Sequence, residues 1–463
     1  MSAVPPLPDP ASAAAPERAV GLWGGLAANI LNMVGIGPFI TIPLAISAMG
    51  GPQALVGWVL GALISLCDGF VWAELGAAMP HSGGSYAYLR RLFGERGLGN
   101  MFAFLFLWQT LLNGPLNVAA GAVGFTNYLS YVFPALGHWT LMGLAALLCL
   151  VNTALLYRHI RSVQVISVIT TVIVIAAFVW IIVSGATHFD VHRAFDFPPN
   201  AFSLNAGFFA GLGSATLIAV YDYGGYSNIC QIGGEVKSPQ RVIPLSILGA
   251  IVLIMVLYLG LNLSIMGSLP WRQVAASTAV VADFMNTIYG RAGGVAVAVL
   301  IMIAGWGSIY VILLGYSRVP YAAAVEGHFL RSFAALHPKG RFPTVSLVVM
   351  GVLSALCCLV KLDALISVLI VVQTLFQYSL QCIGVIVRRG YLKSIGMPYR
   401  MPLFPLPALL SLAGWIYILT TSKLVYIGLG IALFAVGSLI YLIMAHRRRE
   451  WPFAAAPALS EGA

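Results

Sequence analysis

Two acidic residues of this chain, Asp68 and Asp222, lie inside long apolar stretches. Asp222 opens the sequence Asp222-Tyr223-Gly224-Gly225-Tyr226, so a carboxyl group coincides with glycines that interrupt a helix. An earlier apolar stretch is interrupted by Gly35-Ile36-Gly37-Pro38-Phe39. The chemistry that these groups offer is reversible binding. A buried carboxyl group can hold a cation or exchange a proton, and freed backbone N–H groups can hold an anion.

The other reactive residue types form no catalytic or metal-binding pattern. All six cysteines fall inside apolar runs without CxxC spacing, which predicts neither a disulfide framework nor a zinc site. All eight histidines fall in loops or at the ends of apolar runs, which argues against a histidine proton relay. No GxxxxGK[ST] loop is present, which excludes a transport ATPase. We therefore expect a protein that is not an enzyme and that needs no cofactor and no metal.

The composition places most of the chain in a lipid bilayer. Charged residues make up 8% of the chain, hydrophobic residues make up 60%, and the mean hydropathy is +0.93, whereas soluble proteins carry about 25% charged residues. One membrane crossing takes about 20 apolar residues. The apolar runs predict about twelve transmembrane helices, at 21–49, 54–79, 99–131, 136–157, 162–184, 203–234, 242–266, 292–325, 343–360, 364–387, 402–420 and 424–445. Two of them, 343–360 and 402–420, are short and border prolines.

The charge pattern sets the orientation. The net charge is +10, but the basic residues follow the loops and do not form the single patch that a nucleic acid needs. With twelve helices, 19 of the 24 lysines and arginines fall on one side of the membrane. The positive-inside rule then puts both termini in the cytoplasm of a cell-membrane protein. Residues 1–17 are rich in proline and alanine and are expected to be disordered, 18–449 form the transmembrane domain, and 450–463 form a cytoplasmic tail.

The two interrupted runs occupy equivalent places in two halves of the chain. Repeat one spans about 21–184 and repeat two about 203–388, and the last two helices, at about 402–446, are an appendage. Each half holds five helices, so the second half enters the membrane from the opposite side. The expected fold is an all-α integral membrane protein with a five-plus-five inverted repeat, in which helices 1 and 6 are broken. Paired breaks of this kind indicate the substrate site of a secondary transporter.

Four stretches resemble the amino acid–polyamine–organocation superfamily of permeases. The first break is similar to the family's Gly-Ser-Gly-Ile-Phe, and the end of helix 2 reads AELGAAMPHSGGSYAYLRRLFG at 73–94. Helix 8 and its loop carry Ser-Arg, Glu-Gly and His-Pro-Lys within 315–347. Helix 6 reads YGGYSNICQIGGEVKSP at 223–239 and is most similar to the L-type amino acid transporters. The resemblance covers roughly 20–450.

This resemblance implies a secondary permease for amino acids that works by alternating access, coupled to an ion or running as an exchanger. In similar proteins, backbone N–H groups at the first break hold the substrate carboxylate, and carbonyls at the second break hold its ammonium group. Carried onto this sequence, the first set is Gly35, Ile36 and Gly37. The second set is Tyr221, Asp222 and Gly224. Gly225 would give the backbone room to unwind, and Tyr226 would be a gate over the substrate.

Three departures from the family pattern keep an alternative open. Ile36 replaces the usual serine, Pro38 has no N–H to offer, and Asp222 replaces a small neutral residue. These favour a permease for polyamines or other organic cations, whereas the Tyr-Gly-Gly-Tyr context favours amino acids. There are structural alternatives too: Pro38 can begin the second half-helix, and Asp222 can cap free N–H groups. A channel would need a repeated filter segment and a membrane enzyme would need clustered acids or histidines, and the sequence shows neither.

The coupling ion is left open between a proton and sodium. Asp222 or Asp68 could titrate, while Thr171, at the place of a family lysine, and Ser308 could supply oxygen ligands to sodium. Helices 3, 8 and 10 are expected to line the pocket through Gln109, Asn113, Asn117, Trp306, Tyr310 and Gln377. The expected partners are a small amino acid or amine, the coupling ion and the lipid bilayer. No nucleic acid is expected, and without a cysteine in the external loops no accessory subunit is implied.

Overall fold

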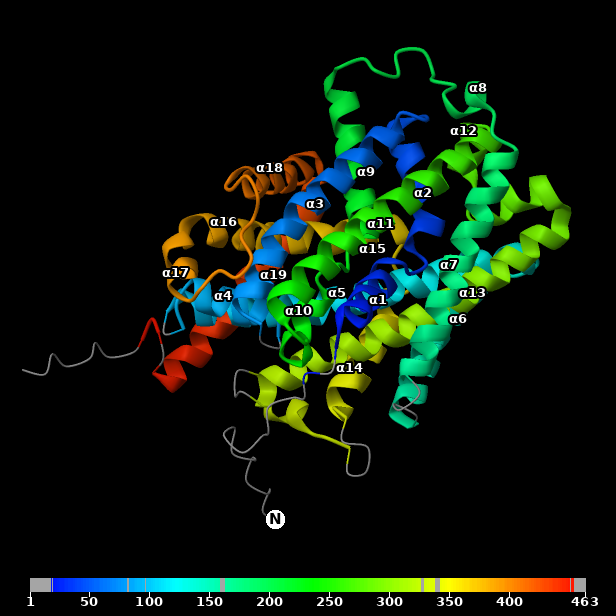
Figure 1. Cartoon of the computed structure of the whole chain (residues 1–463). Helices are drawn as coiled ribbons and strands as arrows, with labels where there is room; N and C mark the ends of the chain where they lie inside the picture. Colours follow the sequence, from blue (N-terminus) through cyan, green and yellow to red (C-terminus); the bar gives the residue numbers. More distant parts are fainter. Residues whose placement is uncertain are drawn as a thin grey trace, which may run out of the picture.

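A computed structural model of the chain describes residue 18 and residues 20–80, 83–95, 97–158, 163–325, 329–337, 342–449 and 451–453. Every regular element in these residues is a helix, so the predicted all-α class is confirmed. The helices pack against one another in one bundle (Figure 1). The segment expected to be disordered, 1–17, and most of the tail 450–463 lie outside the described residues.

The helices follow the predicted apolar runs. The first half contains α1 (Leu22–Met33), α2 (Gly37–Met49), α3 (Ala54–Ala78), α5 (Leu98–Val132), α6 (His138–Arg158) and α7 (Val163–Thr187). The second half contains α9 (Ala206–Tyr223), α10 (Asn228–Gln231), α11 (Pro239–Ser268), α13 (Val280–Val325), α14 (Thr344–Cys357), α15 (Leu362–Gln373) and α16 (Ser379–Val387). The final pair is α18 (Leu406–Thr421) and α19 (Leu424–Arg448). Short connecting helices are α4 (Ser85–Leu92), α8 (Val191–Ala194), α12 (Trp271–Ala276) and α17 (Arg389–Ser394).

Several of these helices suit a membrane. Within the described residues, seven are long and apolar enough to cross a bilayer, or eight if α1 and α2, which meet at 46°, count as one span. The two runs that border prolines form shorter apolar helices, α14 with 14 residues and α18 with 16. The exact count of twelve therefore stays a prediction. α19 exposes large apolar side chains along its length, such as Leu424, Leu429 and Leu439, as a lipid-facing helix does.

Both predicted breaks are present. α1 ends at Met33 and α2 begins at Gly37, so that Pro38 is the second residue of α2, where its missing N–H leaves no helical hydrogen bond unmade. α9 ends at Tyr223, and the chain is unwound through Gly224 to Ser227. Only four α-helical residues follow, in α10, before a 3₁₀ turn at Gly233–Glu235. The second half-helix is thus shorter than the run 203–234 suggested.

The segments that flank the two breaks are paired. α2 packs against α9, and α1 packs against α10 and α11. Just before α1, the Val20 N–H donates to the Glu235 carbonyl at 2.9 Å, and the Lys237 N–H donates back to Val20 at 2.8 Å. The half-helix before one break therefore lies beside the segment after the other, which is the arrangement that an inverted repeat predicts. α3 packs against α9, α11 and α18, and α5 packs against α13 and α15, so these helices enclose the breaks.

Candidate functional site

The two breaks touch each other directly. Gly225 has φ +107°, a conformation that residues with a side chain rarely adopt. A Cβ atom at this position would lie 2.8 Å from the carbonyl carbon and oxygen of Asn32, at the end of α1. Nearby, the Ile229 N–H donates to the Asn29 side-chain oxygen at 3.0 Å and fixes α10 against α1. The second break needs glycine because the first break occupies the space beside it.

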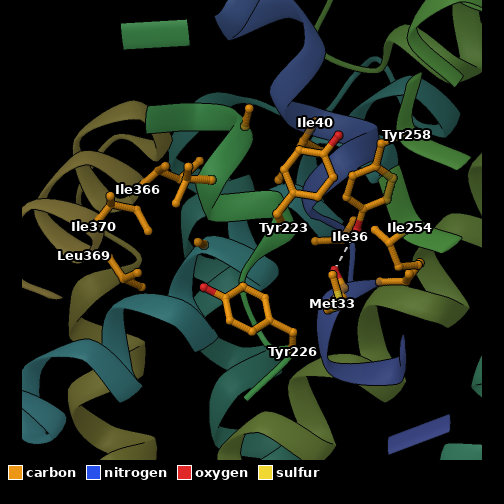
Figure 2. Packing of buried hydrophobic residues seen from close by; sticks show 14 of the residues in the cluster. Met33, Ile36, Ile40, Tyr223, Tyr226, Ile254, Tyr258, Ile366, Leu369 and Ile370 are labelled. Atoms are coloured by element: carbon orange, nitrogen blue, oxygen red, sulfur yellow. Dashed lines mark hydrogen bonds between the residues drawn. The ribbon is translucent and has the colours of Figure 1, made fainter. Parts of the chain in front are cut away.

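Buried tyrosines satisfy backbone carbonyls that have no partner within their own helix. The Tyr258 hydroxyl of α11 donates to the Met33 carbonyl at 2.7 Å, and it lies 3.3 Å from the Asp222 carbonyl. Figure 2 shows Tyr258 directed toward Met33, with the Tyr223 ring beside it. The Tyr128 hydroxyl of α5 donates to the Phe39 carbonyl in α2 at 2.6 Å, because Pro43, four residues further on, has no N–H to offer that carbonyl. Inside a membrane each such group needs a partner, so Tyr258 allows the helices to stay broken and Tyr128 allows α2 to contain a proline.

The Asp222 carboxyl group joins the two broken helices. It is buried, with 2% of its surface exposed. Its Oδ2 accepts a hydrogen bond from the Thr41 hydroxyl of α2 at 2.5 Å. Its Oδ1 has no hydrogen-bond partner among the described residues, and it lies so close to Gly37 that a Cβ atom there would collide with it. One oxygen is therefore anchored to α2, and the other is open at the N-terminus of that helix.

A cavity of about 120 Å³ lies between the breaks. Its lining includes seven of the eight predicted substrate-binding residues: Gly35, Ile36, Gly37, Tyr221, Asp222, Gly224 and Gly225. Four of the predicted wall residues also line it: Gln109, Asn113, Asn117 and Gln377. Among the described residues on the lining, Asp222 alone carries a carboxyl group. The cavity is thus polar and has a single acidic side chain.

The polar wall of the cavity is connected by hydrogen bonds between helices. The Gln109 amide of α5 donates to the Gln377 carbonyl oxygen at 2.8 Å, and Gln377 in turn donates to Ser85 of α4 at 3.0 Å. Gln377 stands on a π-helical turn, Thr374–Tyr378, between α15 and α16. Such turns widen a helix locally and are frequent at functional sites. Here the turn carries both Gln377 and Tyr378 at the cavity.

Other predicted residues lie away from the lining. Tyr226 is buried outside it, with its hydroxyl group on Asp68, so its role as a gate stays a prediction. Trp306 and Tyr310 have their rings 6.0 Å apart and are also outside the lining. Ser308 lines the cavity beside Gly35, whereas Thr171 does not line it. The sodium site proposed from Thr171 and Ser308 stays untested.

Several residues at the site were not predicted from the sequence. Thr41 holds Asp222, and Asn32, Ser227, Tyr316 and Tyr378 line the cavity. Thr41 could have been found from its spacing, because it follows Gly37 by four residues and so lies on the same face of α2. No comparable spacing in the sequence points to the other four residues.

Glu74 has a structural role near the end of α3. It is fully buried, forms an ion pair with Arg389 of α17, and accepts a hydrogen bond from the Met401 N–H at 2.7 Å. Tyr399 lies in the same loop, and burial together with the negative charge of Glu74 raises the pKa of its phenol to about 12. Glu74 therefore fixes the loop before α18 and does not belong to the cavity.

The chain is similar to known membrane transporters over most of its length. Residues 20–446 match the model of a family described as amino acid permease. The serine/threonine exchanger SteT of Bacillus subtilis is 25% identical over 449 residues, which cover 93% of this chain and 98% of that protein. Large neutral amino acids transporter small subunit 2 of Mus musculus is 28% identical over 92% of this chain and 81% of its own length. Cationic amino acid transporter 4 of Mus musculus is 28% identical over 77% of this chain and 58% of its own length.

Proposed function

The chain belongs to the amino acid permease family, and from this premise we propose that it is a secondary transporter that carries an amino acid across the cell membrane by alternating access. The cavity between the two breaks is the binding site. The relatives named as amino acid transporters support an amino acid as the substrate and do not favour a polyamine. Transport of this kind uses conformational change and makes or breaks no covalent bond, so no enzymatic activity is proposed.

The observation that carries the proposal is the open oxygen of Asp222. A buried carboxylate oxygen without a partner is costly, and a ligand that donates hydrogen bonds relieves this cost. The α-ammonium group of an amino acid is such a donor. The N–H groups of Gly35, Ile36 and Gly37 stand at the start of α2 and suit the substrate carboxylate. Both ends of a zwitterion then have a complement in the same cavity.

The substrate we propose is a small, polar amino acid. The cavity of about 120 Å³ is well below the roughly 300–1,000 Å³ of pockets for larger ligands. Gln109 and Asn113 each have a buried side-chain oxygen that no described residue bonds. Both residues line the cavity from α5 and can bind a hydroxyl or amide group of the substrate. These contacts favour a polar side chain over an aliphatic one.

Orientation and coupling complete the proposal. The excess of basic residues on one side supports a cell-membrane location with both termini in the cytoplasm. The domain limits inferred from the sequence, with repeats at about 21–184 and 203–388, are proposed with it. The coupling ion is a proton or sodium, and Asp222 and Asp68 are the acidic residues at membrane depth. No accessory subunit is proposed, because the six cysteines lie within the predicted helices and offer no external disulfide.

Counterflow in proteoliposomes tests this proposal. Vesicles loaded with unlabelled L-serine are diluted into radiolabelled L-serine. Parallel vesicles are loaded with unlabelled L-leucine, L-arginine or putrescine and are diluted into the radiolabelled form of the same compound. We expect label to accumulate for serine, less for leucine, and none for putrescine. Accumulation of putrescine without any amino acid would contradict the proposal, because an amine has no carboxylate for the N-terminus of α2.

A further inference from the structure

A second buried carboxyl group lies outside the cavity and has a complete set of hydrogen-bond donors. Asp68 of α3 is 0% exposed. Its Oδ2 accepts from the Tyr226 hydroxyl at 2.7 Å. Its Oδ1 is approached by the Ser411 hydroxyl and the Trp415 indole N–H, each at 3.2 Å, and by the Cys382 thiol at 3.7 Å. No lysine, arginine or histidine in the described part of the chain forms an ion pair with it.

These donors come from three separate parts of the protein. Tyr226 belongs to the unwound segment after α9, Cys382 to α16, and Ser411 and Trp415 to α18. Asp68 therefore connects the second break with helices outside the two broken pairs. Any movement of the unwound segment relative to α3 must stretch or break the bond to Tyr226.

Asp68 does not line the cavity, but residues next to its hydrogen-bond partners do. The residues on either side of Tyr226, Gly225 and Ser227, both line the cavity. Tyr378 also lines it, and its ring stacks on Trp415 with 4.5 Å between the ring centroids. A change at Asp68 thus reaches the substrate site both along the backbone and through a stacked aromatic pair.

The donor set determines what protonation of Asp68 would do. Oδ1 faces an indole N–H that can only donate, so Oδ1 must remain an acceptor. An added proton therefore goes to Oδ2, where the carboxyl O–H would face the Tyr226 O–H. Two O–H groups cannot both donate in one hydrogen bond, so the charge-assisted bond is lost. The Tyr226 hydroxyl must then turn away or accept a hydrogen bond from the carboxyl O–H. No other covalent bond changes, and the negative charge disappears.

The same surroundings exclude a metal cation at this position. Sodium and similar hard cations need several oxygen atoms that present lone pairs. The groups around Asp68 present an indole N–H, a thiol and hydroxyl hydrogens that already point at the carboxylate. The other titratable groups that face it are Tyr226, Tyr378, Cys382 and, on the same helix, Cys67, all neutral when protonated.

We propose that Asp68 is the proton site that couples transport to a pH gradient, with the hydrogen bond to Tyr226 as the link to the second break. The inference rests on the proposed transport function and adds the coupling ion and its binding residue to it. The deprotonated form holds the unwound segment against α3 by a charge-assisted hydrogen bond, and protonation replaces this bond by a weaker neutral one or breaks it. Tyr226 acts here as a positioning residue, because it reaches the substrate site through its neighbours Gly225 and Ser227.

The test compares two modes of transport in proteoliposomes. Counterflow of labelled L-serine needs no net proton movement, whereas accumulation driven by an imposed pH gradient does. We expect the wild type to show both. In Asp68→Asn, gradient-driven accumulation should fall at least tenfold toward the level without a gradient, while counterflow persists and shows that the protein is folded. Tyr226→Phe keeps the carboxyl group but removes the link, and should weaken the gradient response by a smaller factor.

Glu74→Gln is the matched control, because it also removes a buried negative charge from α3. It should lower thermal stability and leave the gradient response intact. Gradient-driven accumulation that persists in Asp68→Asn would overturn the inference, as would a wild type that shows counterflow but no response to the pH gradient. If the wild type transports no amino acid in either mode, the proposed function itself fails. In that case, proton uptake by the purified protein, measured with a pH dye, tests the inference separately. The wild type should take up a proton that Asp68→Asn does not take up.

Discussion

Replacing Asp222 by asparagine removes the carboxyl group that we assign to the substrate's ammonium group, with almost no change in side-chain volume. The side chain is buried, its Oδ2 is held by Thr41 at 2.5 Å, and its Oδ1 is open to the cavity. Asparagine can keep one oxygen for Thr41 or for the substrate, but it brings an NH₂ group that needs an acceptor. The ammonium group of the substrate then loses its charged partner and meets a donor or a neutral acceptor.

The expected loss follows from the strength of the bond that is weakened. A hydrogen bond to a charged group contributes about 1.5–3 kcal/mol and a neutral one about 0.5–1.5 kcal/mol. The difference is about 1–1.5 kcal/mol, and since 1.4 kcal/mol is about a tenfold change in affinity, the substrate should bind about 5- to 12-fold more weakly.

Isothermal titration of L-serine into purified protein measures this loss, with Thr41→Ser as the control that keeps the hydroxyl on Asp222. Thr41→Ser should bind within a factor of about two of the wild type. An affinity for Asp222→Asn that stays within the same margin would refute the assignment of Asp222 to the ammonium group.

Three further predictions concern the scaffold of the site. Gly225→Ala should unfold at a lower temperature and lose uptake. A residue with a side chain pays about 1–3 kcal/mol for φ +107° alone, and its Cβ would also meet the backbone of Asn32. Normal uptake by this variant would contradict the contact between the breaks. Tyr258→Phe leaves a buried carbonyl at the end of α1 without its donor, so a thermal-unfolding series should show a loss of about 1–3 kcal/mol. Arg389→Met leaves Glu74 as an uncompensated buried charge and should destabilise by about 3–5 kcal/mol, whereas the affinity for substrate, measured by titration, should not change.

The fold and the positions of the breaks could be predicted because they depend on local sequence. Closely spaced glycines, with a proline beside them at the first break, mark where the two broken helices stop, and the structure places the stops at Met33 and Tyr223, within a few residues of the predicted breaks. A single proline, such as Pro115 or Pro244, stays inside its helix. Most predicted substrate-binding residues line the cavity because backbone groups at a break lie at the break whatever the packing. Pro38 follows the same local logic, as the second residue of α2.

The contacts that give the acidic residues their surroundings could not be predicted in this way. Thr41 and Asp222 are 181 positions apart, and Asp68 and Trp415 are 347 positions apart. Such pairs depend on how whole helices are rotated, and the nearly uniform hydrophobicity of membrane helices gives no periodic signal for rotation. Trp306 and Tyr310 illustrate the difficulty, because their helix was correctly placed near the cavity but the face that they occupy was not.

A structure of the protein with L-serine bound tests the proposed binding site most directly. We expect density for the amino acid between the breaks, with the ammonium nitrogen within hydrogen-bond distance of Asp222 Oδ1 and the carboxylate at the N–H groups of Gly35, Ile36 and Gly37. Density for the substrate at any other place, or in the reverse orientation with its carboxylate at Asp222, would contradict this proposal.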